Sequence, residues 1–375
     1  MHSMAIDRRT FTASLAALGL GGFLPLPVRG ELRTGYLSTG FDTLTGHHLV
    51  SRLDQQLDIV WDLPLPARGH ATTIRPGGSE ALVVARRPGS YAVVFDLEDG
   101  TRRHTLTPVA GRHFYGHGVY SADGGTLWMT ENSFETGDGM IGVYDTVRGY
   151  APIAAFPSGG IGPHQLAMLG DGRTLVVAIG GIRTHPDSGR TKLNLETMQP
   201  SLVYMDAATG RILEQVHFED PARHTLSIRH LAVMADDAVA FACQDQTEGG
   251  EQAPLVFTHR MGSAMAFRQL PMPGSVLRQM AGYCGSVAYD PAGAVLAVSA
   301  PRGGQVAFWK MPEGRWLESF AIKDGCGVAQ AKDHPGFVLS NGEGLLVETA
   351  ENRAPLHQQR HPFRRWDNHL TAILS

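Results

Sequence analysis

The chain of 375 residues is 43% hydrophobic and 18% charged, and its formal net charge is -4. This length allows one large all-β domain or two ordinary domains with a proper core. The sequence has no basic run and no block of like charge, which argues against nucleic-acid binding and against a disordered tail.

The first 30 residues are predicted to be an export signal. Arg8 and Arg9 are followed by Phe11 and by a mildly apolar run from residue 13 to residue 26. This pattern resembles a bacterial twin-arginine signal, although a chance pair of arginines before an apolar stretch would look the same. The run is too short and too interrupted to span a membrane. We therefore expect a periplasmic protein with residues 31–375 as one domain and with no stable membrane span after signal removal.

A repeating unit follows, made of a strand, a turn, a strand of the LVVA type, a loop and a strand of the VYD type. The unit begins six times along the chain, at Gly69, Gly116, Pro163, Arg229, Cys284 and Cys326, and the run NHLTAIL from Asn368 begins a seventh unit. A repeat of this length, without long amphipathic helices, is typical of a propeller. The third unit also holds a long insertion, from residue 180 to residue 201, which we expect to be functional or disordered.

The truncated last unit can be completed from the other end of the chain. Strand-like runs, GELRTGYLSTG and HHLVSRLDQQLDIVWDLPLP, precede residue 67. Closing the ring in this way removes the exposed sheet edges. The sequence thus predicts an all-β fold, a seven-bladed β-propeller closed by strands from both termini. Six or eight blades remain alternatives, because divergent blades are hard to count.

One position near the start of the repeat is occupied by metal-binding residue types throughout. Its occupants are His70, His117, His164, His230, Cys284, Cys326 and His369. They are separated by 47, 47, 66, 54, 42 and 43 residues, and the insertion explains the longest interval. Composition alone would place about 0.3 histidine at seven arbitrary positions. Because the first strand of each propeller blade lines the axis, these side chains are predicted to converge there.

Imidazole and thiolate groups bind transition metals and are poor ligands for Mg²⁺ or Ca²⁺. We therefore predict an iron or copper ion in a His/Cys ring at one mouth of the central channel. Two alternatives remain open. The histidines could simply form hydrogen bonds between blades, and Cys284 and Cys326 could form a disulfide, which would leave only the histidines as ligands.

The loops after the second strands are expected to surround the same mouth as a polar funnel. The residues in question are Arg86, Arg87, Glu131, Asn132, His185, Asp245 and Arg302. Arginines suit contacts with carboxylate or phosphate, and Glu131 or Asp245 could take part in acid–base chemistry. Ordinary solvated loops would have a similar composition. Cys243 is expected to be a small buried residue.

Several strings in the mature chain resemble a bacterial family of twin-arginine-exported proteins with a domain of unknown function. They include GRHFYGHGVYSADGGTLWMTEN, GIGPHQL, LVVAIGGIRTHPDSGR and LSIRHLA. Members of that family often occur beside imelysin-type iron-uptake lipoproteins and dihaem peroxidase-like proteins. The resemblance implies a part in periplasmic iron acquisition and an imelysin-like or haem-containing partner, and it implies no particular activity.

Three functions fit these patterns. The first is a periplasmic metal-binding propeller that assists iron acquisition. The second is an enzyme, either a metal-dependent oxidoreductase or a propeller that processes a small anion. The third is a protein-binding scaffold for an iron-uptake partner, which would not depend on the axial histidines.

Overall fold

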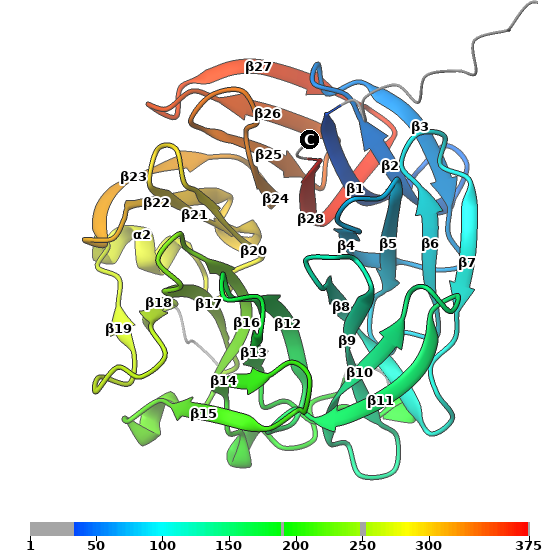
Figure 1. Cartoon of the computed structure of the whole chain (residues 1–375). Helices are drawn as coiled ribbons and strands as arrows, with labels where there is room; N and C mark the ends of the chain where they lie inside the picture. Colours follow the sequence, from blue (N-terminus) through cyan, green and yellow to red (C-terminus); the bar gives the residue numbers. More distant parts are fainter. Residues whose placement is uncertain (1–33, 189–190, 248–252, 374–375) are drawn as a thin grey trace, which may run out of the picture.

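The computed structural model describes residues 34–188, 191–247 and 253–373. In this part of the chain, seven four-stranded antiparallel sheets surround a central axis, which confirms the predicted seven-bladed β-propeller (Figure 1). The predicted export signal, with Arg8, Arg9 and Phe11, lies outside the described residues. No helix within the described ranges is long and apolar enough to cross a membrane.

Six blades run from the axis outward in chain order. They consist of β4 (Gly69–Ile74), β5 (Glu80–Ala85), β6 (Ala92–Asp96) and β7 (Arg102–Leu106); β8 (Arg112–Tyr120), β9 (Thr126–Ser133), β10 (Gly139–Asp145) and β11 (Ala151–Pro157); β12 (Pro163–Met168), β13 (Thr174–Ile179), β14 (Ser201–Asp206) and β15 (Ile212–His217); β16 (Leu226–Val233), β17 (Val239–Asp245), β18 (Val256–His259) and β19 (Arg268–Gln269); β20 (Ser286–Asp290), β21 (Val295–Ala300), β22 (Gln305–Lys310) and β23 (Arg315–Ala321); β24 (Gly325–Gln330), β25 (Phe337–Asn341), β26 (Leu345–Thr349) and β27 (Pro355–Arg360). The short helix α2 (Gly274–Gln279) precedes β20, and 3₁₀ turns occur at Pro186–Ser188, Leu195–Thr197, Pro221–Arg223 and Pro301–Gly303.

The remaining blade joins the two ends of the chain. Its innermost strand is β28 (Arg364–Ile373), followed outward by β1 (Gly35–Asp42), β2 (His47–Leu53) and β3 (Ile59–Pro64). Strands β28 and β1 pair with Leu370 opposite Ser38 and Trp366 opposite Gly40. The ring is therefore closed by hydrogen bonds between the first and last strands, as the sequence predicts.

The burial of each strand follows its place in the blade. The second strands, such as β5 with the sequence EALVVA, are buried almost throughout because neighbouring blades cover both faces. Outer strands such as β3 alternate between more and less exposed residues. The VYD-type strands end in an aspartate that caps the following turn. In two blades the Asp96 and Asp145 carboxylates accept hydrogen bonds from the backbone N–H groups of Glu98 and Val147, at 2.8 and 3.0 Å.

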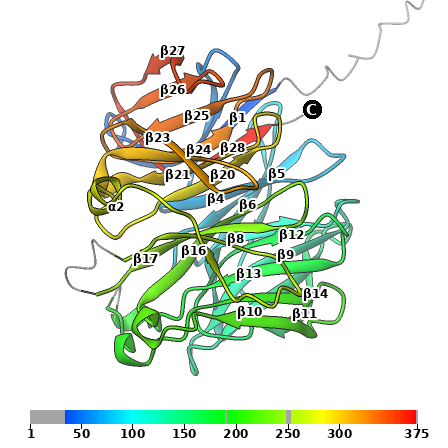
Figure 2. The ribbon, with the colours of Figure 1, turned by 90° about the vertical axis from the view of Figure 1, so that its left-hand side faces the viewer.

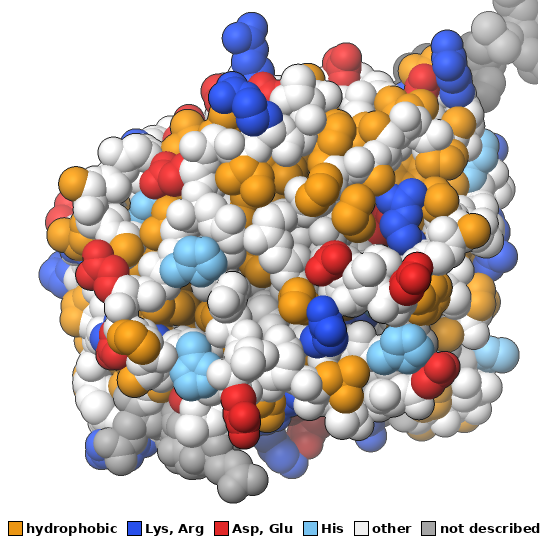
Figure 3. Space-filling view, turned by 90° about the horizontal axis from the view of Figure 1, so that it is seen from below, with side chains coloured by type: hydrophobic (Ala, Val, Ile, Leu, Met, Phe, Trp, Pro, Cys, Tyr) orange, Lys and Arg blue, Asp and Glu red, His pale blue; other side chains and the backbone are white. Residues whose placement is uncertain are grey.

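The hydrophobic core lies between blades. Its largest cluster combines Val176, Phe241 and Leu296, which belong to three successive blades. A side view shows these sheets packed against one another around the ring (Figure 2). On the outer side of the ring seen from below, acidic, basic, histidine and hydrophobic side chains are interspersed (Figure 3).

Candidate metal centre

The inner strands change register where the repeated His or Cys occurs. Strand pairing is interrupted between Gly69 and Thr72, Phe114 and Gly118, Pro163 and Leu166, Ile228 and His230, and Gly325 and Val328. Such bulges redirect side chains and are frequent beside functional sites. In four of these blades the irregular stretch contains or ends at a ring histidine, so the backbone itself helps to turn the imidazole toward the axis.

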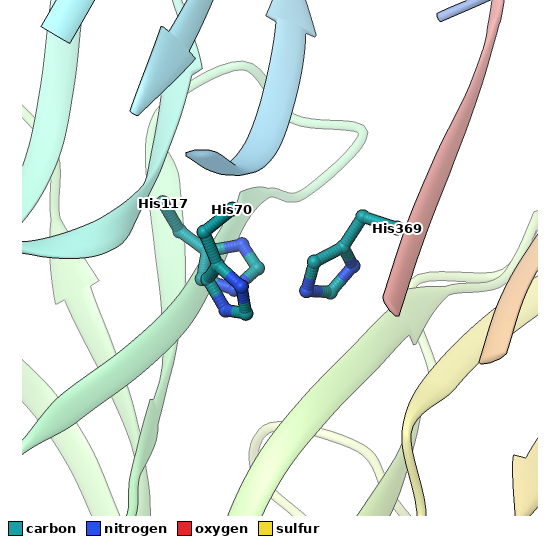
Figure 4. A group of neighbouring side chains, drawn as sticks. All are labelled: His70, His117 and His369. Atoms are coloured by element: carbon teal, nitrogen blue, oxygen red, sulfur yellow. The ribbon is translucent and has the colours of Figure 1, made fainter. Parts of the chain in front are cut away.

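Five histidines from five blades meet there. The ring centroids of neighbouring imidazoles are 4.5–5.9 Å apart, with His70 4.5 Å from His369 and 4.9 Å from His117. On the other side of the cluster, His164 lies 4.8 Å from His230. Figure 4 shows His369 reaching from β28 toward the adjacent rings of His70 and His117. Ring closure thus brings together residues that are almost 300 positions apart in the sequence.

Two groups of three could each hold a metal ion. One is His70, His117 and His369, and the other is His117, His164 and His230. Within each group, potential ligand nitrogens lie within 4.8 Å of one another. All members are buried except His369, which is partly exposed. Because His117 belongs to both groups, it is the central residue of the cluster.

The imidazoles are held in their neutral, metal-binding form. Burial lowers the pKa of four of them well below the ordinary value, with smaller contributions from neighbouring histidines and arginines, and these four are His70, His117, His164 and His230. Burial likewise lowers the pKa of His369 to about 4. A neutral imidazole has a lone pair free for a metal, whereas an imidazolium has none.

Several ring nitrogens of the cluster lack a hydrogen-bond partner. They are His70 Nδ1, His117 Nε2, His164 Nδ1 and His369 Nε2. Unsatisfied buried polar atoms are uncommon in folded proteins and often mark an ion or water that is part of the site. His230 Nδ1 does lie 3.3 Å from Gln165 Oε1 of the neighbouring blade, so hydrogen bonding between blades accounts for this contact but not for the four nitrogens without partners.

Hydrogen bonds from the preceding blade fix the backbone of the ring. The second strand of one blade donates to the carbonyl oxygen of the ring residue of the next. These bonds run from Thr39 Oγ1 to His70 (3.0 Å), from Thr130 Oγ1 to His164 (3.3 Å), from Gln244 Nε2 to Cys284 (3.0 Å) and from Ser299 Oγ to Cys326 (2.6 Å). The bulged positions are thereby held in place before any ion binds.

Replacing Thr130 with valine should weaken metal binding without removing a ligand. The Thr130 hydroxyl also donates to the His117 carbonyl at 3.3 Å, so valine would loosen two ring positions at once. Loss of such supporting contacts commonly costs about 10–100-fold in metal affinity. Metal titration of the variant measures the effect. Thr101→Val, at an exposed turn of another blade, is the control and should bind as the wild type does.

The two cysteines of the ring position do not join the histidine groups. Cys326 Sγ donates to the Trp366 carbonyl at 3.5 Å, and both thiols are buried and free. Burial raises the pKa of Cys326 to about 12 and raises that of Cys284 still further. A cysteine side chain is shorter than a histidine side chain, so the sulfur stays nearer the channel wall. No disulfide joins Cys284 to Cys326, and Cys243 is buried as expected.

Part of the expected funnel is present as a small pocket against the histidines. Arg86 and Arg87 line it together with His70, His164 and His230. Arg302 lies farther out, with its guanidinium 4.5 Å from the ring centroid of Tyr283, which lines the pocket. Asp245 and His185 are not part of the pocket lining. The Asp245 carboxylate accepts a hydrogen bond from the Thr247 backbone N–H, and His185 Nδ1 accepts one from the Asp187 backbone N–H.

Glu131 and Asn132 are not funnel residues, which corrects the expectation from the sequence. Both belong to β9 and are fully buried inside the blade. The Glu131 carboxylate lies 2.9 Å from the Arg112 guanidinium and accepts a hydrogen bond from the Tyr144 hydroxyl. Burial raises the pKa of Glu131, and Tyr144 and Arg112 only partly offset the rise. The cause of the error is strand length, because β9 continues to Ser133 where a loop was expected.

Comparison with known protein families identifies a match over most of the chain. The family described as "Protein of unknown function (DUF1513)" matches residues 63–373. The chain belongs to the DUF1513 family. A search of curated proteins finds no significant relative. Among solved structures, this DUF1513 protein resembles "Kuenenia stuttgartiensis Hydrazine Synthase", with a TM-score of 0.61 and 16% identity over 91% of this chain and 99% of that chain. At this identity the likeness extends to the fold alone.

The pocket of this DUF1513 protein also includes residues that the sequence did not indicate as site residues, among them Arg229, Tyr115 and Tyr283. Arg229 and Tyr115 are 3% and 1% exposed and line the pocket with Tyr283. A signal for Arg229 was present, because an arginine directly before His230 falls inside a strand that should be buried. Tyr115 and Tyr283 precede ring positions by one or two residues and look like ordinary apolar strand residues.

Proposed function

We propose that this protein is a periplasmic metal-binding propeller that holds an iron or copper ion in its histidine cluster and assists iron acquisition. The observation that carries the proposal is the cluster of five neighbouring imidazoles, four of which have one buried ring nitrogen without a hydrogen-bond partner. Imidazole nitrogens alone suit copper, iron and zinc and are poor ligands for Mg²⁺ and Ca²⁺. Both candidate groups supply three such nitrogens.

The metal content of the protein tests this proposal. Wild-type protein, isolated from the periplasm without metal-affinity resin, is expected to contain up to one equivalent of iron or copper. His117→Ala/His164→Ala, which breaks both candidate groups, should lose the metal or bind it more weakly, and His217→Ala, at an exposed position on β15, should not. A wild-type protein that is isolated without metal and binds neither ion on titration would overturn the proposal.

The donor set also predicts an order of affinity. A site of neutral imidazoles should follow the Irving–Williams order, so copper(II) is expected to bind at least about tenfold more tightly than iron(II). Competition titration of the metal-free protein measures this ratio. Tighter binding of iron(II) would contradict the prediction and would indicate that oxygen ligands from another molecule complete the site.

The cellular part of the proposal rests on the sequence. The Arg8-Arg9 pair supports export by the twin-arginine route, and the family resemblance supports an imelysin-like or haem-containing partner. Cell fractionation of Arg8→Lys/Arg9→Lys tests the route, because the variant should remain in the cytoplasm. Co-purification of the periplasmic wild type tests the partner.

A further inference from the structure

A second site lies directly against the histidine cluster. It is a pocket of about 30 Å³ lined by His70, Arg86, Arg87, Tyr115, His164, Arg229, His230, Gln244, Tyr283 and Asn368. Of the described residues in this lining, three are arginines and none is an aspartate or glutamate. Asp367 lies outside this lining. It interacts electrostatically with Arg86, but its carboxylate is paired with Arg68 through two contacts of 2.6 and 2.9 Å.

Two side chains of the pocket, Arg87 and Tyr115, contact each other directly. Arg87 Nη1 donates to the Tyr115 hydroxyl at 2.5 Å, and the Arg87 guanidinium lies 5.2 Å from the centre of the Tyr115 ring. Arg229 is 3% exposed. The pocket thus has a built lining with a strongly positive local field.

A metal ion in the adjacent histidine cluster would increase the excess of positive charge around the pocket. An imidazole carries no negative charge in its neutral or its protonated form, so a divalent cation would add to the three guanidinium groups nearby. Like charges in a poorly solvated interior repel strongly, and burial of an uncompensated charge is costly. A bound anion in the pocket would relieve both costs.

We propose that this pocket binds a small oxyanion as the counter-charge of the metal centre. Guanidinium groups present paired N–H donors that match the oxygens of carbonate, carboxylate or phosphate. A water molecule requires roughly 10–15 Å³ of such space, so the pocket has room for an anion of the size of bicarbonate or phosphate and not for a polycarboxylate such as citrate. The coupling to the metal rests on the proposed function, whereas the anion site itself does not.

Calorimetric titration with two probes tests this inference. Metal-free protein is titrated with bicarbonate and with phosphate, and copper(II) is then titrated with and without the anion that binds. We expect binding of at least one of the two, no binding of citrate, and a rise of at least about tenfold in copper affinity when the anion is present. By reciprocity, copper should tighten the binding of the anion by the same factor.

Charge variants assign the effect to the pocket. Arg87→Gln and Arg86→Gln change partly exposed residues and should each weaken anion binding about tenfold or more and reduce the coupling to copper. Arg211→Gln, at an exposed turn, is the matched control and should change neither. Circular dichroism and thermal unfolding verify that each variant is folded.

The outcomes separate the two proposals. If bicarbonate or phosphate binds and the arginine variants abolish it while no metal binds, the anion site stands and the proposed metal function fails. If copper binds with the same affinity in the presence and absence of both anions, and neither anion binds the metal-free protein, the inference is overturned and the metal centre remains.

Discussion

Replacement of His117 by alanine is expected to abolish metal binding, whereas replacement of His70 or His230 should leave one candidate group intact. His117 belongs to both groups, His70 only to the first and His230 only to the second. Loss of a direct ligand should cost more than the 10–100-fold typical of supporting residues, so we expect a loss of more than about 100-fold. Titration with copper(II) measures the affinity of each variant.

The pattern among the three variants identifies the group that binds. If His70→Ala weakens binding and His230→Ala does not, the ion sits with His70, His117 and His369, and the reverse pattern places it with His164 and His230. Equal large losses in both would indicate an ion shared by the whole cluster. Wild-type affinity in His117→Ala would contradict the proposed centre, and His217→Ala again serves as the exposed control.

Replacement of Glu131 by leucine should lower the free energy of unfolding by about 3 kcal/mol, since removing one partner of a buried ion pair leaves the other uncompensated. Glu131 is fully buried and its partner Arg112 nearly so, with 0% and 17% of their side chains exposed. Leucine would also remove the acceptor of the Tyr144 hydroxyl. Denaturant unfolding measures the change.

A second replacement separates the ion pair from packing. Arg112→Met together with Glu131→Leu should recover part of the lost stability, because no buried charge then lacks a counter-charge. Metal affinity should change little in any of these variants, because neither residue belongs to the histidine groups. An equally unstable double variant would show that the blade depends on the shape of these side chains rather than on their charge.

The pH dependence of this effect has a defined sign. The folded-state pKa of Glu131 is raised above its unfolded value of about 4.5, so the folded protein retains this proton longer as the pH rises. The contribution of Glu131 to stability is therefore fully present below pH 4.5 and decreases as the pH rises through the folded-state pKa. Glu131→Gln should accordingly cost more at pH 4 than at pH 7, and unfolding at both values tests this.

The sequence predicts the ring because periodicity maps directly onto the propeller. A residue type repeated at one position of each unit must recur at one radius, and closure then brings His70 and His369 together. The periodicity does not predict the bulges, because a bulge depends on how two strands pair and not on the spacing of residues along one strand. They place the imidazoles where the axis can be reached, yet leave the shorter Cys326 bound to the Trp366 carbonyl.

The other differences between the predicted and the observed site concern Glu131 and Arg229. The sequence predicts Glu131 in the loop after the second strand, but β9 continues to Ser133, and Arg112 and Tyr144 hold the Glu131 carboxylate inside the blade. Arg229 directly precedes His230 in a strand expected to be buried, which is a signal in the sequence, but only the packed blades show that it lines the same pocket as the histidines. The partners of Glu131 lie on β8 and β10, and the linear sequence does not indicate that they meet it.

The blade that contains β28 and β1 differs from the other six, because its innermost strand is far in sequence from the strand with which it pairs. Nothing covalent prevents the last strand from peeling away from the first. An ion bound by His369, His70 and His117 would link β28 to the blades that contain β4 and β8. It would connect His70 and His369, which are 299 positions apart in the sequence. An ion that binds only the folded ring stabilises it by mass action. Metal binding would then slow the separation of β28 from β1.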